Sequence, residues 1–382
     1  MNKKEVLEIR KTFQVENNAL YTIRGCYVDG EKNICVDSKQ RFSSLPEEDE
    51  HKYVEIFKKG LSGVMGKNLL NMEFPLEEEQ EEGGKHEFLM RLRNSGLDDD
   101  DLVTEFYRQV IEYYAAVENY YIVLVHGRYD VPGKASSGEI MEDASGTVYD
   151  FILCCICPSE LTKAGLGYNQ QKNCIEDRFR DWIVDPPANA FLFPAFTDRT
   201  NDIHSLLYYS KKPEELQYAF IDNVLGCRAP MSAGTQKENF MAIMEQTLGD
   251  EVDYETFSNI HDTFTQLMDD NKDNEEPYVF TGYDVKNVLL DNGIEEDQLE
   301  DFDRIFEEQA GEEGAFLASN VVDAKKFKIE TADVEIKVNP DALERIETRR
   351  IDGKECLVIT VDDRVTVNGM SVRTMKKKEV EE

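Results

Sequence analysis

The stretch YDFILCCICPSEL, residues 149–161, is the strongest strand signal in the chain. It is a continuous apolar run bounded by polar residues, which is typical of a strand buried on both faces. YYIVLVHGRYDVP, residues 120–132, has the same character. Alternation along the first stretch places Cys155 and Cys157 on one face of a sheet and Cys154 on the other. These two stretches therefore predict the core of a sheet.

Other strand-like segments lie on both sides of this core, and the order of elements indicates the fold class. Most neighbouring strand segments have no helix between them, which favours a mixed, largely antiparallel sheet flanked by helices. Helical patterns dominate after Pro213, one of them starting at Thr281 and Asp284. Strand patterns return from residue 315, with a hairpin around Asp352-Gly353. The chain is therefore predicted to be α+β, with a helical middle segment and a small C-terminal β module.

The same pattern predicts three domains. They are an α+β sheet core at 1–212, a helical segment at 213–312 and the β module at 313–382, which ends in a frayed tail.

Charge excludes several classes of partner. The 382 residues hold 43 Lys+Arg and 78 Asp+Glu, a formal net charge of −35. Such a surface repels nucleic acid and anionic lipid, so direct binding to either is not expected. The hydrophobic content of 41% is too high for a disordered acidic chain. Residues 315–382 hold 13 basic and 14 acidic residues, which leaves −34 on residues 1–314 and suggests a separate contact role for the C-terminal module.

Compartment follows from the N-terminus, the apolar runs and the cysteines. MNKKEVLEIRKTF, residues 1–13, lacks the apolar segment of a secretory signal, and the longest apolar runs are too short to cross a bilayer. A cytoplasmic protein without a membrane partner is therefore expected, with its eight cysteines reduced. No second ligand pair accompanies the three cysteines of residues 154–157, so they are predicted to pack in the core and no metal site is expected.

Residues 269–280 have part of the pattern of a calcium loop. Acidic or amide residues occupy the first, third and fifth positions. Asn274 stands at the sixth position in place of Gly, and Phe280 stands at the twelfth in place of Glu. The segment is therefore predicted to be a solvated linker.

Two polar groups at the ends of apolar strands supply candidate catalytic residues. The first contains His126 and Asp130, and the second contains Asp198, Asp202 and His204. If these strand ends lie together, imidazole and carboxylate groups would provide a base or hold a hard metal ion. The alternative is that the acidic residues form tight turns while each histidine caps or packs.

A third candidate site precedes a predicted helix and would bind a phosphate group. Its candidate ligand-binding residues are Arg228, Ser232, Gly234, Thr235 and Lys237. Backbone N–H groups at a helix N-terminus bind anions, and the two basic side chains would assist. The alternative is an ordinary helix start, capped by Thr235 and Glu238.

Several segments resemble an uncharacterised bacterial family known only as a domain of unknown function, found mostly in anaerobic low-GC Gram-positive bacteria. They are NLLNMEFP (68–75), PGK (132–134), YDFILCCICP (149–158), LFPAFTDRTNDIHSLLYYSK (192–211), SAGTQKENF (232–240) and IDGKECLVITVDD (351–363). The resemblance covers nearly the whole chain and implies a cytoplasmic bacterial protein. It brings no activity and no catalytic residues.

The C-terminal third also resembles the end of the nucleoid-associated protein family. The resemblance rests on KFKIETADVEIKVNP (326–340) and IDGKECLVI (351–359), a lysine-rich strand followed by a glycine-turn hairpin. It implies a similar fold in this part of the chain.

These observations favour a non-enzymatic interaction protein, of nucleoid-associated type, that binds a protein partner through its acidic face or its C-terminal module. The alternative is a metal-dependent or phosphate-ligand enzyme with its site near His126 and His204. The sequence indicates no particular cofactor and no oligomeric state.

Overall fold

The apolar stretch at 149–161 lies at the centre of the largest sheet. In the computed structural model it belongs to β7 (Thr147–Leu161), which pairs with β4 (Tyr120–Val131) on one side and β11 (Asn189–Phe193) on the other. The sheet has the order β2-β1-β4-β7-β11-β14-β3, and β10 is an additional partner of β7. All of its pairings are antiparallel within the described residues. The predicted α+β class is confirmed.

The structure describes residues 1–14, 17–134, 140–141, 146–249, 252–274, 276–311, 314–361, 365–367 and 370–372. They form two compact units. The first comprises Met1–Thr235 with Glu275–Pro277, and the second comprises Gln236–Asn274 with Tyr278–Glu382. The predicted three-domain division stays a prediction, and the frayed tail lies outside the described residues.

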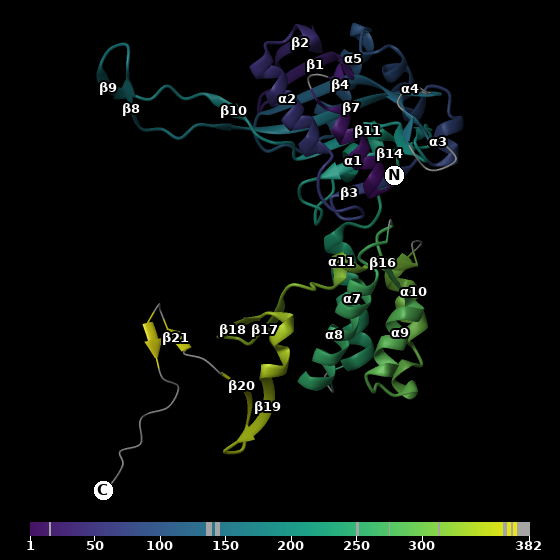
Figure 1. Cartoon of the computed structure of the whole chain (residues 1–382), viewed down its shortest axis with the longest axis vertical. Helices are drawn as coiled ribbons and strands as arrows, with labels where there is room; N and C mark the ends of the chain where they lie inside the picture. The colour runs from purple at the N-terminus through teal and green to yellow at the C-terminus, as the bar shows by residue number, and fades with distance from the viewer. Residues whose placement is uncertain are drawn as a thin grey trace. The chain divides into compact units, whose positions relative to one another are not determined.

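The first unit contains the large sheet and the helices around it (Figure 1). Its elements in chain order are α1 (Lys3–Thr12), β1 (Leu20–Val28), β2 (Ile34–Arg41), a 3-10 turn (Phe42–Ser44), α2 (Glu47–Gly60), β3 (Leu69–Glu73), α3 (Leu76–Gln80), α4 (Lys85–Asn94), α5 (Asp100–Tyr113), β4, β5 (Gly133–Lys134), β6 (Ile140–Met141), β7, β8 (Leu166–Asn169), β9 (Cys174–Asp177), β10 (Trp182–Val184), β11, β12 (Ala195–Thr197), β13 (Thr200–Asp202), β14 (Ser205–Ser210), α6 (Tyr218–Phe220) and a π-helix (Ile221–Leu225).

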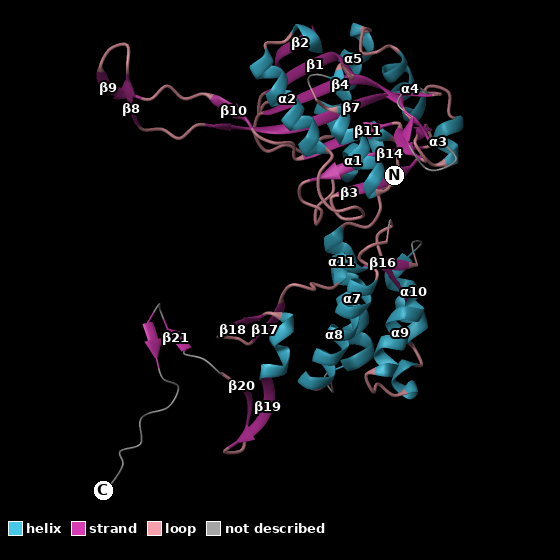
Figure 2. Cartoon of the chain, viewed as in Figure 1, coloured by secondary structure: helices cyan, strands magenta, loops and turns pink. Residues whose placement is uncertain are grey.

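Helices cover both faces of this sheet (Figure 2). On one face, Ile152, Cys154 and Ile156 of β7 pack with residues of α4, α5 and the π-helix. On the other face, Cys155 and Cys157 pack with residues of α1 and α2. The predicted division of the three cysteines between the faces is therefore confirmed. Because both faces are buried, β7 is apolar at almost every position instead of alternating.

The second unit is helical at first and ends in separate strand pairs. Its elements are α7 (Ala233–Leu248, which begins in the first unit), α8 (Tyr254–Asp270), β15 (Val279–Thr281), α9 (Gly282–Asp291), a 3-10 turn (Glu296–Leu299), α10 (Phe302–Ala310), β16 (Ala315–Leu317), α11 (Ala318–Val321), β17 (Phe327–Glu330), β18 (Glu335–Val338), a 3-10 turn (Pro340–Arg345), β19 (Ile346–Ile351), β20 (Lys354–Ile359), β21 (Val365–Val367) and β22 (Met370–Val372). Strands 17 to 22 form three antiparallel hairpins.

Two helix–loop–helix segments form much of the second unit. α8 leads through β15 into α9, α10 leads through β16 into α11, and the two strands pair through Phe280 and Phe316. From α7, the Phe240 ring packs against the rings of Phe264, Phe280 and Phe316, with centroid distances of 5.7, 6.5 and 5.9 Å. α7 thus contributes Phe240 to the aromatic core of the second unit.

The predicted solvated linker at 269–280 is wrong at both of its ends. Asp269 and Asp270 are the last residues of α8, and Phe280 is completely buried in β15. The polar residues before Phe280 indicated a solvated segment, whereas the pairing of β15 with β16 places Phe280 in the core. Immediately afterwards, the Asp284 carboxylate accepts hydrogen bonds from the Thr281 N–H (2.9 Å) and hydroxyl (2.7 Å) and so caps α9.

Candidate functional site

His126 lies in β4, and its buried side chain belongs to a polar cluster with Arg128 and Asp150. Its Nε2 is 3.0 Å from Asp150 Oδ1 in β7, and the imidazole side chain is only 7% exposed. Arg128 Nε donates to Asp150 Oδ2 at 2.6 Å. Burial alone would raise the pKa of the Asp150 carboxyl, but the hydrogen bonds and charges of His126 and Arg128 outweigh it and leave this pKa below its usual range. Asp130, further along β4, is exposed.

Asp198, Asp202 and His204 lie in and beside the β12–β13 hairpin. Asp198 and Arg199 are its two central residues, with φ of 51° and 59°, and β12 and β13 pair directly on either side of them. Asp202 accepts hydrogen bonds from the His204 N–H (3.2 Å) and the Ser205 hydroxyl (2.6 Å). These two acidic residues thus serve the turns, as the alternative interpretation expects.

The exposed His204 has a carboxylate partner of its own. Its Nδ1 lies 2.9 Å from Glu79 Oε1, and this hydrogen bond raises the pKa of His204 above its usual value. Charge on Glu79 therefore favours the protonated imidazole.

The two histidines do not share a site. His126 is on β4, whereas His204 precedes β14, and β7 and β11 lie between these strands. Three strand spacings separate their backbones by about 14 Å. Within the described residues, no group of three or more His, Cys, Asp or Glu side chains could hold a metal ion. The structure therefore does not bring together the residues that a single base or metal site would need.

The candidate phosphate-binding residues surround the start of α7. The helix begins at Ala233, two residues before the predicted cap Thr235, and the Ser232 hydroxyl accepts from the Thr235 N–H at 3.0 Å. The Ala233 N–H donates to Pro213 O at 2.9 Å. These contacts occupy two of the N–H groups that an anion would use. A Cβ on Gly234 would lie 3.0 Å from the backbone oxygen of Glu214, so glycine permits close packing there.

In the sequence, Arg228 precedes α7 by five residues and Lys237 lies within the helix. Arg228 belongs to the first unit and the exposed Lys237 to the second. The roles of all these residues stay predictions.

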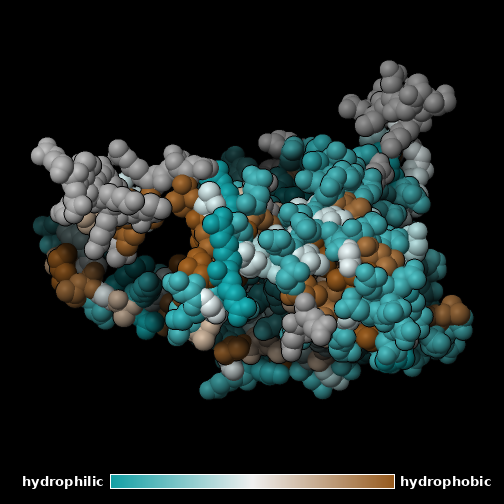
Figure 3. All heavy atoms as spheres, turned by 90° about the horizontal axis from the view of Figure 1, so that it is seen from below, coloured by the Kyte–Doolittle hydropathy of each residue, from teal (hydrophilic) through white to brown (hydrophobic). Residues whose placement is uncertain are grey.

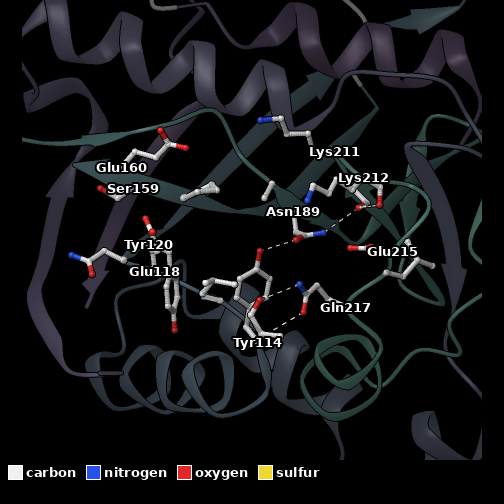
Figure 4. A pocket seen from close by; sticks show the side chains of 18 residues that line it. Tyr114, Glu118, Tyr120, Ser159, Glu160, Asn189, Lys211, Lys212, Glu215 and Gln217 are labelled. Carbon is white, nitrogen blue, oxygen red and sulfur yellow. Dashed lines mark hydrogen bonds between the residues drawn. The ribbon is translucent and has the colours of Figure 1, made fainter. Parts of the chain in front are cut away.

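A pocket of about 720 Å³ lies between the end of α5, the start of β4 and the segment after β14 (Figure 4). Several polar groups that line it are hydrogen-bonded to one another or to the backbone. Tyr114 Oη donates to Asn189 Oδ1 at 2.7 Å, and Asn189 Nδ2 donates to Tyr208 Oη at 2.8 Å. The Gln217 amide exchanges two hydrogen bonds with the Ala115 backbone, at 3.2 and 3.3 Å. These hydrogen bonds join the segments that line the pocket.

Several strongly exposed apolar side chains of the first unit lie on a two-stranded extension. β7 and β10 pair at its base, and the chain between them, residues 162–181, projects from the sheet with β8 and β9 near its tip (Figure 1). We call residues 162–181 the arm. Its ladder includes the Thr162 N–H to Asp181 O (2.9 Å) and the Arg178 N–H to Gly165 O (2.8 Å). None of its residues is buried.

Four large apolar side chains of the arm are exposed. They are Leu166 (78%), Tyr168 (62%), Ile175 (63%) and Phe179 (82%). Other exposed apolar side chains include Trp182, Ile183 and Val184 of β10, at the base of the arm. Much of the face seen in Figure 3 is hydrophilic, with hydrophobic residues among it. Exposed apolar residues gathered on one element mark contact sites, whereas single ones are normal. The arm is therefore the candidate functional site.

A known family matches nearly the whole chain. The family described as "Domain of unknown function (DUF4317)" matches residues 1–370. The chain belongs to this family. No curated protein matches it. Membership of DUF4317 confirms the resemblance to a domain of unknown function and assigns no residue a role.

None of the helices in the described part of this DUF4317 chain has both the length and the apolarity to cross a membrane. The arm itself was missed at the sequence level, although a signal for it was present. Leu166 and Tyr168 alternate with small or polar residues, and the amide-rich residues 169–173 follow, which is a hairpin pattern. The pattern predicts strands, but it does not reveal that nothing in the same unit covers them.

Proposed function

We propose that this protein is a non-enzymatic interaction protein that binds a protein partner through the arm. The observation that carries the proposal is the exposure of four large apolar side chains on an element with no core of its own. A two-stranded hairpin alone is at best marginally stable in water, and a partner covering its apolar side chains would stabilise it. The acidic surface and residues 315–382 remain further contact surfaces suggested by the sequence.

The enzymatic alternative has less support. A metal-dependent or phosphate-ligand site near His126 and His204 would need side chains that converge. His126 is on β4 and His204 precedes β14, and two strands lie between β4 and β14. Each is hydrogen-bonded to a different carboxylate. A nucleoid-associated role rests on the C-terminal resemblance alone, and the net charge of −35 disfavours direct binding to nucleic acid.

The test compares two variants of the full chain. The arm variant carries Leu166→Ser, Tyr168→Ser and Ile175→Ser. The control carries Leu76→Ser, which removes an equally exposed apolar side chain (65%) from α3. Circular dichroism verifies that both fold. Proteins cross-linked to each chain at physiological salt are then identified by mass spectrometry.

The expected result is that the control retains the partners of the wild-type chain and the arm variant loses them. Equal capture by both variants refutes the role of the arm. A thermal-shift screen with divalent metals, nucleotides and phosphorylated metabolites examines the alternative, because a ligand that binds only the folded state raises the melting temperature. A saturable shift that His204→Ala abolishes would replace the proposal with the enzymatic function.

A further inference from the structure

The arm is a ribbon of two strands that keep one register from its base to its tip. At the base Leu161 lies opposite Trp182, and near the tip Leu166 lies opposite Asp177, five residues further along each strand. Backbone hydrogen bonds between residues 162 and 181 and between residues 165 and 178 keep this register in the intervening part. The alternation of side chains can therefore be followed through the whole arm.

Alternation assigns the exposed apolar side chains and two carboxylates to one face of the ribbon. Residues directly opposite each other, and those two apart along a strand, point to the same face. We call this face the Leu166 face, and it carries Leu166, Tyr168, Ile175, Asp177, Phe179 and Asp181. The Leu166 face is therefore both apolar and acidic.

The basic residues of the arm lie elsewhere. The opposite face carries Lys163, Arg178 and Arg180. Lys172 belongs to the turn at the tip, where its Nζ lies 3.0 Å from Glu176 Oε2. The ribbon therefore separates its charges, with carboxylates beside the exposed apolar side chains and cations on the other side.

Asp177 and Asp181 have no cation of their own. Both residues are exposed, and among the described residues no group is hydrogen-bonded or ion-paired to either carboxylate. A cation held beside a carboxylate within a covered, apolar contact interacts more strongly than in bulk water, because the dielectric constant is lower there. A partner that carries negative charge would be repelled at the same positions. These two carboxylates therefore select a basic partner.

The spacing of the carboxylates indicates the conformation of the occupant. Along the returning strand, apolar and acidic side chains alternate on this face in the order Ile175, Asp177, Phe179, Asp181 and Ile183. Side chains on one face of a strand repeat about every 6.6 Å, so the two carboxylates are about 13 Å apart. An extended segment laid along the ribbon has the same period. In an α-helix, residues about 13 Å apart are about nine positions apart and project from opposite sides, so the spacing favours an extended occupant.

We propose that the occupant of the Leu166 face is an extended basic segment of a partner protein, in which Lys or Arg alternates with large apolar residues on the side that meets the arm. This inference rests on the proposed function and names the chemistry of its partner. The cations neutralise Asp177 and Asp181, while the apolar residues cover their counterparts on the ribbon. The net charge of −35 attracts a basic protein to the molecule as a whole, and the Leu166 face supplies the specific contact.

The area of the face fits a short segment. A two-stranded ribbon is about 10 Å wide, so about 30 Å of it presents roughly 300 Å² to its occupant. Two folded proteins that form a stable complex bury roughly 800 Å² each. The contact is therefore expected to be weak and to dissociate rapidly.

The Leu166 face continues beyond the base of the arm. Glu160 lies opposite Ile183 in the same register, and Ile183 is 51% exposed. Glu160 also lines the pocket of about 720 Å³ together with Val117, which is 96% exposed (Figure 4). A longer basic segment could therefore extend from the arm into this pocket and gain further apolar and acidic contacts.

The experiment measures the binding of a defined peptide to the full chain. The probe is a fluorescently labelled peptide, Leu-Ser-Lys-Ser-Leu-Ser-Lys-Ser-Leu, and its control has Glu in place of both Lys. Fluorescence anisotropy is recorded at physiological salt with protein up to several hundred micromolar. The proteins are the wild type, the arm variant, the Leu76→Ser control and two charge variants.

The two charge variants lose the same net charge at different places. The first carries Asp177→Asn and Asp181→Asn. Its matched control carries Glu48→Gln and Glu77→Gln, which remove two exposed carboxylates from α2 and α3. A general attraction of the basic probe to an acidic protein affects both charge variants equally, whereas binding at the Leu166 face affects only the first.

We expect saturable binding of the Lys probe to the wild type, to the Leu76→Ser control and to the Glu48→Gln, Glu77→Gln control. The arm variant should bind at least about tenfold more weakly, because it lacks three of the apolar contacts. The Asp177→Asn, Asp181→Asn variant should bind about three- to tenfold more weakly, as expected for two lost ion pairs, and with a shallower salt dependence. The Glu probe should bind none of the proteins.

Three results would overturn the inference. They are the absence of saturable binding of the Lys probe to the wild type, equal weakening in both charge variants, and equal affinity of the Lys and Glu probes for the wild type. The cross-linking experiment distinguishes this failure from that of the proposed function. If the arm variant loses the cross-linked partners and the Asp177→Asn, Asp181→Asn variant retains all of them, the arm binds a protein but not through a basic segment. If the arm variant also retains them, the proposed function itself is wrong.

Discussion

Replacing Asp150 with Ala tests whether the buried His126 cluster stabilises the first unit. The substitution removes the carboxylate that contacts both His126 (3.0 Å) and Arg128 (2.6 Å). Arg128 is 55% exposed, so its ion pair contributes little. His126 is almost completely buried, and a hydrogen bond between a buried group and a charged one contributes about 1.5–3 kcal/mol. We expect a loss of about 2 kcal/mol, which with an m-value of about 2 kcal/mol per molar lowers the urea midpoint by about 1 M.

The pH dependence follows from the direction of the pKa shift. The pKa of Asp150 is lower in the folded chain than in the unfolded one. Its stabilisation is therefore complete above the ordinary Asp pKa of about 3.9 and is lost as the pH falls through the lower folded value. The difference between wild type and Asp150→Ala should shrink below about pH 4.

The assay is urea unfolding followed by near-ultraviolet circular dichroism, with Asp130→Ala as the matched control. Asp130 is an exposed carboxylate on the same strand as His126, so its loss should change the stability by less than about 0.5 kcal/mol. Equal midpoints for Asp150→Ala and Asp130→Ala would refute the reasoning. A difference that persists undiminished at pH 2.5 would show that charge on Asp150 is not the cause.

Three further outcomes are expected. In a thiol titration of the folded chain, the exposed Cys35 and Cys174 should react rapidly. Cys154, Cys155 and Cys157 should react only on unfolding, because burial raises the pKa of their thiols, that of Cys157 to about 12. Rapid reaction of all eight cysteines would contradict the structure. Gly127→Ala should lower the free energy of unfolding, measured by thermal melting, by about 1–3 kcal/mol, because the added Cβ would lie 2.4 Å from the buried Phe151 ring. Gly146→Ala is the control and should leave the stability unchanged, because its Cβ would have no atom within 4 Å. NMR titration should give His204 a pKa above 6.5, and the substitution Glu79→Gln should lower this pKa. Because the pKa of His204 is raised in the folded chain, the small stabilisation by this exposed pair is present below pH 6.5. It is lost as the pH rises through the folded value.

The sequence alone determined the features that depend on neighbouring residues. The apolar run at 149–161 is typical of a strand buried on both faces. Period-two alternation along such a strand assigned Cys154 and Cys155 to opposite faces. Asp352-Gly353 specified a two-residue hairpin turn because both positions adopt positive φ, at 49° and 78°. Thr281 and Asp284 marked a helix start for an equally local reason, the reciprocal hydrogen bonds of a capping box.

Only the tertiary structure decided which distant groups meet and which surfaces stay uncovered. The pairing of His126 with Asp150 depends on the register between β4 and β7, and the same sheet order keeps His204 away from both. Phe280 is in the core only because β15 pairs with β16. Leu166 and Tyr168 have the alternation of an ordinary half-buried strand. They are exposed because the arm extends beyond the part of the sheet that helices cover. Local patterns fix the conformation of a segment, whereas burial depends on what the rest of the fold places against it, and a single segment does not encode that.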